Sequence, residues 1–155
     1  MTQLSGKIAI ITGGSRGIGW GIAARFAREG ATVIVASTSP PAKSDRNRIH
    51  WHQTNVANRA EVEAMTEFAI DTFGRVDVLV NNAGVQIEKA IADTTDEDWE
   101  WLTGVNMRGV FLCCRSVIPV MQKQGGGAII NIGSISANNV DPNMALYNAS
   151  KGFVH

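Results

Sequence analysis

The chain is short of cysteine and of net charge, and each shortage excludes a class of protein. Its 155 residues include only two cysteines, the neighbours Cys113 and Cys114. Adjacent cysteines have a poor geometry for a mutual disulfide, so we interpret both as reduced residues of a cytoplasmic protein. The formal net charge is zero and basic residues do not cluster. We therefore expect no nucleic-acid partner, because nucleic acids are bound by basic surfaces.

Long apolar runs and clusters of metal ligands are also missing. No apolar run reaches the ~20 residues that span a bilayer, and residues 1–11 lack the charged and apolar regions of a signal peptide. We therefore expect no membrane association. His50 and His52 alternate on a predicted strand, with no third ligand at a suitable spacing. We interpret them as strand-surface residues and predict no metal site.

Short β-branched runs alternate with helical stretches along the chain, which is typical of a parallel sheet covered on both faces. The length suits one domain, so we predict a single unit over residues 1–155. Its predicted fold class is α/β, a doubly wound parallel sheet of the Rossmann type with five strands in the order 3-2-1-4-5. The predicted strands cover residues 7–12, 32–36, 49–53, 76–80 and 128–132.

Apolar spacing and capping residues predict the helices. A long helical region is predicted from residue 96 to about residue 124, where Gly104 and Pro119 bend or divide it. Asn58 is predicted to open an earlier helix that Gly74 stops. The first helix carries an apolar stripe at four-residue spacing that we expect to face the sheet, formed by Ile18, Ile22 and Phe26.

A glycine-rich turn over residues 12–19 separates the first strand from the first helix. Glycines at such a turn let the backbone approach a pyrophosphate, and the helix start supplies N–H groups and a positive dipole. The spacing is Gly-x-x-x-Gly-x-Gly, which differs from Gly-x-Gly-x-x-Gly. Its position after the first strand favours a nucleotide site over a plain tight turn. The candidate contacts are Gly13, Ser15, Arg16, Gly17, Ile18 and Gly19.

Four further features follow this turn in a fixed order. The fourth strand leads into Asn81-Asn82-Ala83-Gly84, an asparagine lies on the long helix, and a serine follows the fifth strand. Thirteen residues beyond that serine a Tyr-x-x-x-Lys motif begins. With the glycine turn, these marks resemble the short-chain dehydrogenase/reductase family over essentially the whole chain. The residues concerned are Asn106, Ser134, Tyr147 and Lys151.

The resemblance implies hydride transfer between a nicotinamide cofactor and a carbonyl or alcohol, with a proton moving at the substrate oxygen. Tyr147 would be the acid or base, and Lys151, one helical turn further on, carries a charge that favours tyrosinate. Ser134 would hydrogen-bond the substrate oxygen. The family also implies a water-mediated proton relay from Asn106 to Lys151. A lone Tyr-x-x-x-Lys usually means a packed ring and a solvated amine, so the assignment depends on the joint pattern.

The end of the second strand predicts which nicotinamide cofactor is used. NAD-binding members place an acidic residue there, to accept hydrogen bonds from the ribose hydroxyls, whereas this chain has Ser37. Arg16 would instead face a 2′-phosphate, with Lys43 assisting. We therefore predict a preference for NADP(H), with NAD(H) as the alternative. The remaining predicted cofactor contacts are Asn55, Val56, Asn82, Ala83, Gly84, Tyr147 and Lys151.

Family members normally continue past the Tyr-Lys helix with two more strands and a substrate loop. We therefore expect a partial reductase, C-terminally incomplete, whose strand 128–132 is a sheet edge and which has negligible turnover in isolation. The alternative is a complete nucleotide-binding or interaction remnant without turnover. The pattern does not separate ketoacyl reductases from sugar or alcohol dehydrogenases. The full-length parent is expected to be a homo-oligomer, and Trp99 and Trp101 to be packing or interface residues.

Overall fold

Five parallel strands form one sheet in the order β3-β2-β1-β4-β5, which confirms the predicted fold class. The computed structural model describes residues 2–42 and 47–155. Ile10 of the central strand pairs with Ile34 on one side and with Leu79 on the other. The strands are β1 (Ile8–Thr12), β2 (Thr32–Ser37), β3 (Ile49–Gln53), β4 (Val78–Asn81) and β5 (Ala128–Asn131).

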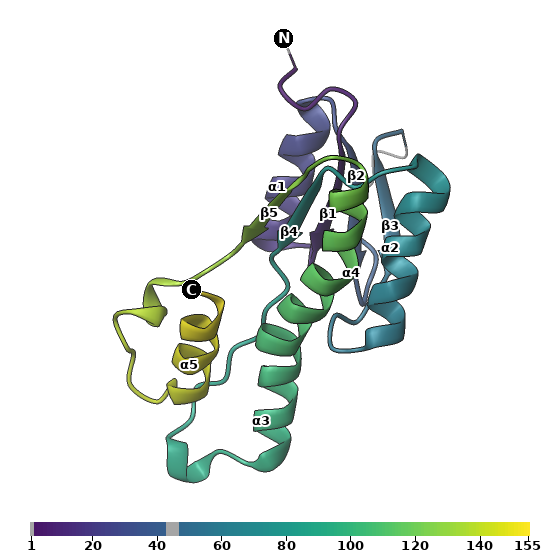
Figure 1. Cartoon of the computed structure of the whole chain (residues 1–155). Coiled ribbons are helices and arrows are strands. Elements are labelled where there is room, and N and C mark those ends of the chain that lie inside the picture. The colour runs from purple at the N-terminus through teal and green to yellow at the C-terminus, as the bar shows by residue number, and fades with distance from the viewer. Residues whose placement is uncertain (1, 43–46) are drawn as a thin grey trace.

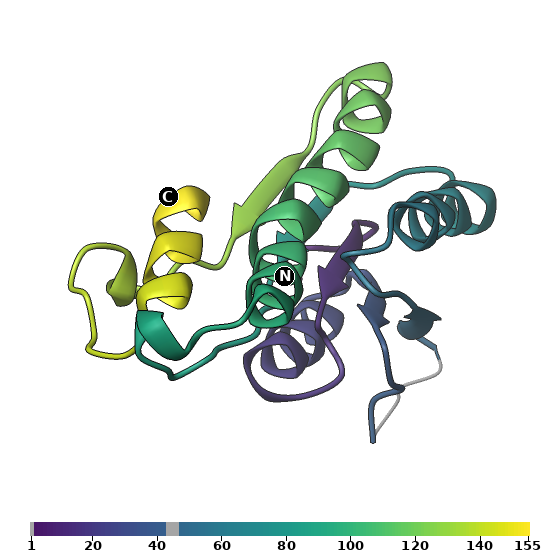
Figure 2. The same ribbon diagram turned by 90° about the horizontal axis from the view of Figure 1, so that it is seen from below.

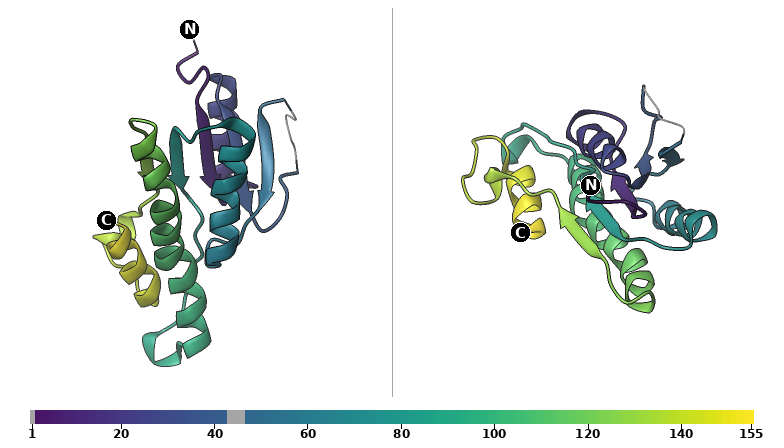
Figure 3. Two further views of the ribbon diagram at one scale, coloured as in Figure 1. Left: turned by 45° about the vertical axis from the view of Figure 1, so that its right-hand side comes forward. Right: turned by 90° about the horizontal axis from the view of Figure 1, so that it is seen from above.

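Helices cover both faces of the sheet, as Figures 1 and 3 show. α1 (Gly17–Arg28) lies on one face, while α2 (Arg59–Phe73) and α4 (Gly109–Lys123) lie side by side on the other. α3 (Asp96–Thr103) and α5 (Ala145–Val154) extend beyond the carboxyl ends of the strands (Figure 1). In the described part of the chain, three short helical segments complete the order, namely η1 (Ile91–Asp93), the π-helical η2 (Gly104–Arg108) and η3 (Ile135–Ala137).

Alternation along the central strand divides the core into two layers. Ile8 and Ile10 point towards α2 and α4, where Val62, Met65 and Val117 are buried. Ala9 and Ile11 belong to the opposite layer, together with Ala23 and Ala27 of α1. Side chains of a strand alternate between its two faces, so a strand of five buried residues serves both layers.

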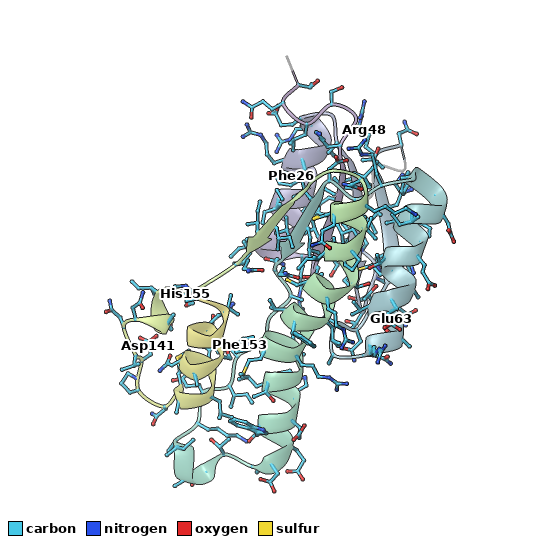
Figure 4. All side chains as sticks on the ribbon, in the orientation of Figure 1. Phe26, Arg48, Glu63, Asp141, Phe153 and His155 are labelled. Carbon is cyan, nitrogen blue, oxygen red and sulfur yellow. The ribbon has the colours of Figure 1, made fainter. Side chains whose placement is uncertain are left out.

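The predicted stripe on α1 is wrong at its first position. Ile18 is 69% exposed, whereas Ile22 and Phe26 are partly buried against the core. The inward face consists of the smaller residues Gly19, Ala23 and Ala27. Small residues let a helix approach a sheet closely, and this moves the larger apolar side chains to the margin of the contact. Figure 4 labels Phe26 on this helix.

The helix caps follow the sequence closely. The side chain of Asn58 accepts from the backbone N–H groups of Ala60 and Glu61, and Gly74 ends α2 in the left-handed conformation. At α3, Thr95 and Asp98 form a reciprocal capping box. Asn58 and Thr95 thus satisfy N–H groups that the first turn of each helix leaves without partners.

The long helical region changes geometry at Gly104 but not at Pro119. α3 passes into the π-turn η2 and then into α4, and Pro119 lies inside α4. Viewed from below, α3 and α4 run on without a break, and β5 points towards α5 (Figure 2). Gly104 therefore divides this region only through the change from α to π geometry, and Pro119 does not divide it.

The sheet edges differ from each other in exposure. At the β3 edge, the ring of His50 lies 5.1 Å from Phe73 and that of His52 lies 5.3 Å from Phe68, so both histidines pack beneath α2 instead of lying on the surface as predicted. At the other edge, β5 is largely exposed. No helix occurs in residues 38–42 or 47–48. Among the described residues, no helix has the length and hydropathy needed to span a membrane.

Candidate active site

The glycine-rich turn is built around two left-handed glycines. Gly13 has a φ of 62°, and a Cβ placed there would lie 2.8 Å from the Ala83 Cα. Gly17 has a φ of 55°, and a Cβ placed there would meet nothing within 4 Å. Gly13 therefore lets two loops touch, whereas Gly17 begins α1 beside open space. Such a turn is suited to bind an anionic group at the start of the helix.

Hydrogen bonds fasten this turn to the loop that follows β4. The Thr12 hydroxyl donates to the Val80 carbonyl at 3.3 Å and accepts from the N–H groups of Asn82 and Ala83, each at 3.0 Å. The Asn82 amide donates in return to the carbonyls of Thr12 and Gly13, at 2.9 Å and 3.2 Å. Thr12 was not predicted as a site residue, although its place directly before Gly13 was a usable signal.

A cleft of about 740 Å³ lies along the carboxyl ends of the strands. We call it the central cleft; its walls are the glycine turn, the end of β2, the loops after β3 and β4, and part of α3. Of the predicted cofactor contacts, eleven line it, namely Gly13, Ser15, Arg16, Ile18, Gly19, Ser37, Asn55, Val56, Asn82, Ala83 and Gly84. Its position, glycine turn and exposed Ile18 fit a dinucleotide, because ligands of open α/β sheets bind at this edge.

The end of β2 carries a small hydrogen-bonded group in place of an acidic residue. The Ser37 hydroxyl donates to the Ser39 carbonyl at 2.8 Å and accepts from the Trp51 indole at 3.2 Å. Arg16 is exposed and lines the same cleft. Lys43, which was predicted to assist Arg16, lies outside the described residues.

The π-turn η2 holds Asn106 in the interior, where it is 2% exposed. Its amide donates to the Val85 carbonyl at 2.8 Å and to the Ser150 hydroxyl at 3.0 Å, while its oxygen accepts from the Val85 N–H at 2.8 Å. Asn106 thus joins the long helix to the loop after β4 and to α5. π-Turns often occur at functional sites, but the spacing of apolar residues does not reveal them.

Lys151 and Tyr147 lie one turn apart on α5. The Lys151 ammonium is 5.8 Å from the centre of the Tyr147 ring and donates to the Ile132 carbonyl at 2.9 Å. Lys151 is only 7% exposed, and its burial lowers the pKa of its ammonium group. This lysine is therefore not the solvated amine that a lone Tyr-x-x-x-Lys usually carries.

Ser134 lies two residues after Ile132, whose carbonyl accepts from Lys151. Its hydroxyl accepts from the Ser136 N–H at 3.2 Å and so begins η3. The Ser136 hydroxyl donates to the Asp141 carboxylate at 2.8 Å, which ties together the loop that Figure 4 shows beside α5. The side chain of Ser134 is half-buried.

Gly84 connects the central cleft with these polar residues. It lines the cleft, and a Cβ placed on it would lie 3.6 Å from the Asn106 oxygen and 3.8 Å from the Lys151 nitrogen. Ser134, Tyr147 and Lys151 are not among the residues that line the cleft in the described part of the chain. The structure therefore brings Asn106, Tyr147 and Lys151 together beside the end of the cleft at Gly84.

Several residues of the site were not predicted. Ser150 bonds to Asn106, and Glu100 and Trp101 line the central cleft from α3. Ser150 stands directly before Lys151, which was a usable signal. Trp101 and Trp99 could not be told apart in the sequence, because only the packing of α3 decides which of them faces the cleft. Within the described residues, no group of three or more His, Cys, Asp or Glu side chains is placed to hold a metal ion.

A parallel sheet with a glycine turn and a cleft at its carboxyl edge defines the class of dinucleotide-binding α/β proteins. The family model described as short chain dehydrogenase matches residues 7–155. The chain belongs to the short-chain dehydrogenase family.

Named relatives and a solved structure agree with this assignment. The NADP-dependent (R)-specific alcohol dehydrogenase of Lentilactobacillus kefiri is 39% identical over 98% of this chain and 64% of its own length. The 3-oxoacyl-[acyl-carrier-protein] reductase FabG of Thermotoga maritima is 35% identical over 98% of this chain and 65% of its own. The chain thus spans about two thirds of the length of these curated relatives.

The structure of 3-ketoacyl-(acyl-carrier-protein) reductase from Brucella melitensis, complexed with NADH, superposes with a TM-score of 0.92. It is 36% identical, and the match covers 98% of this chain and 67% of that one. The sheet order and the surrounding helices are therefore those of a short-chain dehydrogenase.

Proposed function

We propose that this chain carries the cofactor site and the proton-transfer group of an oxidoreductase that interconverts a small carbonyl compound and an alcohol. The observation that carries the proposal is the buried Lys151 ammonium, held at the Ile132 carbonyl and 5.8 Å from the centre of the Tyr147 ring. The Lys151 charge would favour the phenolate during proton transfer, which acid-base chemistry at a tyrosine requires.

The residues of the central cleft divide into two binding roles. The backbone of the turn from Gly13 to Gly19 would hold the pyrophosphate, and the loop from Asn82 to Gly84 would border the nicotinamide ring. The nicotinamide, when bound, supplies or accepts the hydride. This division is supported by Gly84, which lies next to both Asn106 and Lys151.

In carbonyl reduction, Tyr147 would donate its proton to the substrate oxygen, and Ser134 would hold that oxygen with a second hydrogen bond. The Lys151 charge would stabilise the phenolate that remains. Asn106, held by Val85 and Ser150, would fix the loop after β4 and take part in returning the proton through water. Alcohol oxidation would use the same residues in the reverse order.

We further propose that NADP(H) is preferred over NAD(H). Among the described residues, the end of β2 offers the hydroxyl of Ser37 in place of the carboxylate that would repel a 2′-phosphate. Arg16 is an exposed guanidinium on the wall of the same cleft, and guanidinium groups bind phosphate through paired hydrogen bonds. A relative named as an NADP-dependent alcohol dehydrogenase supports this choice.

The proton-transfer role is tested by Tyr147→Phe, which removes the hydroxyl of the only tyrosine in the chain. Because the chain spans two thirds of its relatives, turnover is assayed in a chimera that adds the C-terminal third of the Thermotoga reductase. We expect Tyr147→Phe to lower kcat for NADPH-dependent ketone reduction by about 100-fold or more, the usual contribution of a general acid. The Kd for NADPH should stay unchanged. A chimera that keeps its kcat without this hydroxyl contradicts the proposal.

A further inference from the structure

Two tryptophans on α3 look alike in the sequence but lie in different surroundings. Trp99 is 49% exposed and Trp101 is 52% exposed, so neither belongs to the core. Of the two, only Trp101 lines the central cleft. A half-exposed indole at the wall of a ligand cleft presents apolar area that a ligand can cover.

The long helix packs on the loop after β3 just beyond Trp101. A Cβ placed on Gly104 would lie 3.5 Å from the Ala57 Cβ, and one placed on Gly109 would lie 2.8 Å from the Val56 side chain. The long helix therefore rests directly on residues 56–57. Trp101 stands about one helical turn before Val105, which lines the cleft on the same side.

Two parts of the central cleft offer a ligand different chemical groups. The glycine turn and Arg16 offer N–H groups and positive charge, which suit phosphates. Apolar Val56, Val105 and Trp101 line the cleft as well, together with the Asn55 amide and the Glu100 carboxylate. A flat purine ring with polar edges suits this mixture of apolar and hydrogen-bonding groups, whereas a phosphate beside the Glu100 carboxylate does not.

We propose that Trp101 binds the adenine base of the dinucleotide by covering one face of the ring, with Val56 and Val105 beneath it. The inference rests on the proposed function, because it needs a nicotinamide dinucleotide in the central cleft. Stacking of an indole on a base adds affinity whichever groups the edge of the base carries, and it needs no charged side chain. Trp101 thus contributes affinity for the adenosine half of either cofactor and does not discriminate between NADP(H) and NAD(H).

The test uses the 155-residue chain and small probes of the adenosine half. Calorimetric titration with 5′-AMP compares the wild type with Trp101→Ala, and Trp99→Ala is the matched control on the same helix. We expect Trp101→Ala to weaken 5′-AMP binding about ten-fold, within the range found for loss of base stacking, and Trp99→Ala to change it less than two-fold. Trp101→Phe, which keeps an aromatic face, should recover most of the affinity.

Inorganic pyrophosphate, which lacks the base, separates stacking from a general loosening of the cleft. Its affinity should be the same in the wild type and in Trp101→Ala. Equal affinity of 5′-AMP for both proteins, or an equal loss for pyrophosphate and 5′-AMP, would overturn the role of Trp101 and leave the dinucleotide site standing. Failure of the wild-type chain to bind 5′-AMP at all would instead refute the dinucleotide site, and the role of Trp101 with it.

Discussion

The buried ammonium of Lys151 should make the stability of the protein depend on pH in a specific direction. Burial lowers the pKa of Lys151 below its ordinary value of 10.5. In the range between the lowered pKa and 10.5, the unfolded chain holds this proton and the folded chain does not. The unfolded state therefore binds more protons there, and folding becomes more favourable as the pH rises.

Lys151→Met removes this titration and isolates its effect. We predict that the free energy of unfolding of the wild type, relative to that of Lys151→Met, increases from neutral pH to pH 10.5. Urea unfolding at several pH values measures the difference. Lys151→Arg is the control, since a guanidinium stays charged throughout this range. A difference between wild type and Lys151→Met that is constant with pH would show that the buried ammonium does not titrate as described.

At the residue scale, order along the chain revealed more of the site than composition did. Tyr147 and Lys151 could be predicted because one helical turn places them on one face, and Asn82 to Gly84 because they follow a buried strand. The contact of Lys151 with the Ile132 carbonyl could not be predicted, since it depends on how α5 packs against the end of β5. Tertiary contacts of this kind have no local signal.

At the scale of the element, α1 owes its position to the glycines of its first turns. A Cβ on Gly19 would overlap the Asn82 amide and lie 2.5 Å from the Gly13 carbonyl oxygen, whereas one on Gly21 would meet nothing within 4 Å. We predict that Gly19→Ala destabilises the fold by about 1–3 kcal/mol through overpacking. Gly21→Ala should be neutral or stabilise it by up to about 1 kcal/mol through helix propensity.

Thermal and urea unfolding of both variants measure these effects. The two substitutions add the same methyl group to the same helix. Helix propensity alone would therefore change the free energy of unfolding of both variants in the same direction. A Gly19→Ala chain as stable as Gly21→Ala would show that the close approach of α1 to the Asn82 loop is not required.

Element boundaries were predictable where a cap or a glycine marks them, as at Asn58 and Gly74. The π-turn was not predictable, because the hydrogen bonds that Asn106 makes there to Val85 and Ser150 are tertiary contacts without a local signal. The exposure of Ile18 was missed for a related reason. A periodic stripe shows which residues could face a sheet, but close packing of Gly19 and Ala23 decided which ones do.

At the scale of the whole molecule, an exposed stripe on α4 predicts self-association. Phe111 and Ile118 are exposed and seven positions apart, and Arg115 lies over the Phe111 ring at 5.1 Å. Residues at this spacing share one helix face, and apolar groups on an exposed face favour contact with another copy. We predict that Phe111→Glu shifts the chain towards monomers in sedimentation velocity experiments. An unchanged distribution would exclude this face as the contact.

The topology of the sheet was predictable because alternating strands and helices leave few ways to cover a parallel sheet, and right-handed crossovers reduce them further. The packing of α2 over the β3 edge of the sheet was not predictable. His50 and His52 alternate as surface residues do, yet α2 lies over them. Whether an edge strand is covered depends on where the neighbouring helix packs, and no residue of the strand predicts that position.

The central claim is that the cleft at the glycine turn is a nicotinamide dinucleotide site with a preference for the 2′-phosphate. Fluorescence titration of the 155-residue chain with NADPH and with NADH tests it most directly, with Ser37→Asp as the companion variant. We predict that NADPH binds the wild type about ten-fold or more tightly than NADH, equivalent to about 1.4 kcal/mol, and that Ser37→Asp reverses this order. Tighter binding of NADH by the wild type, or no binding of either cofactor, would contradict the account.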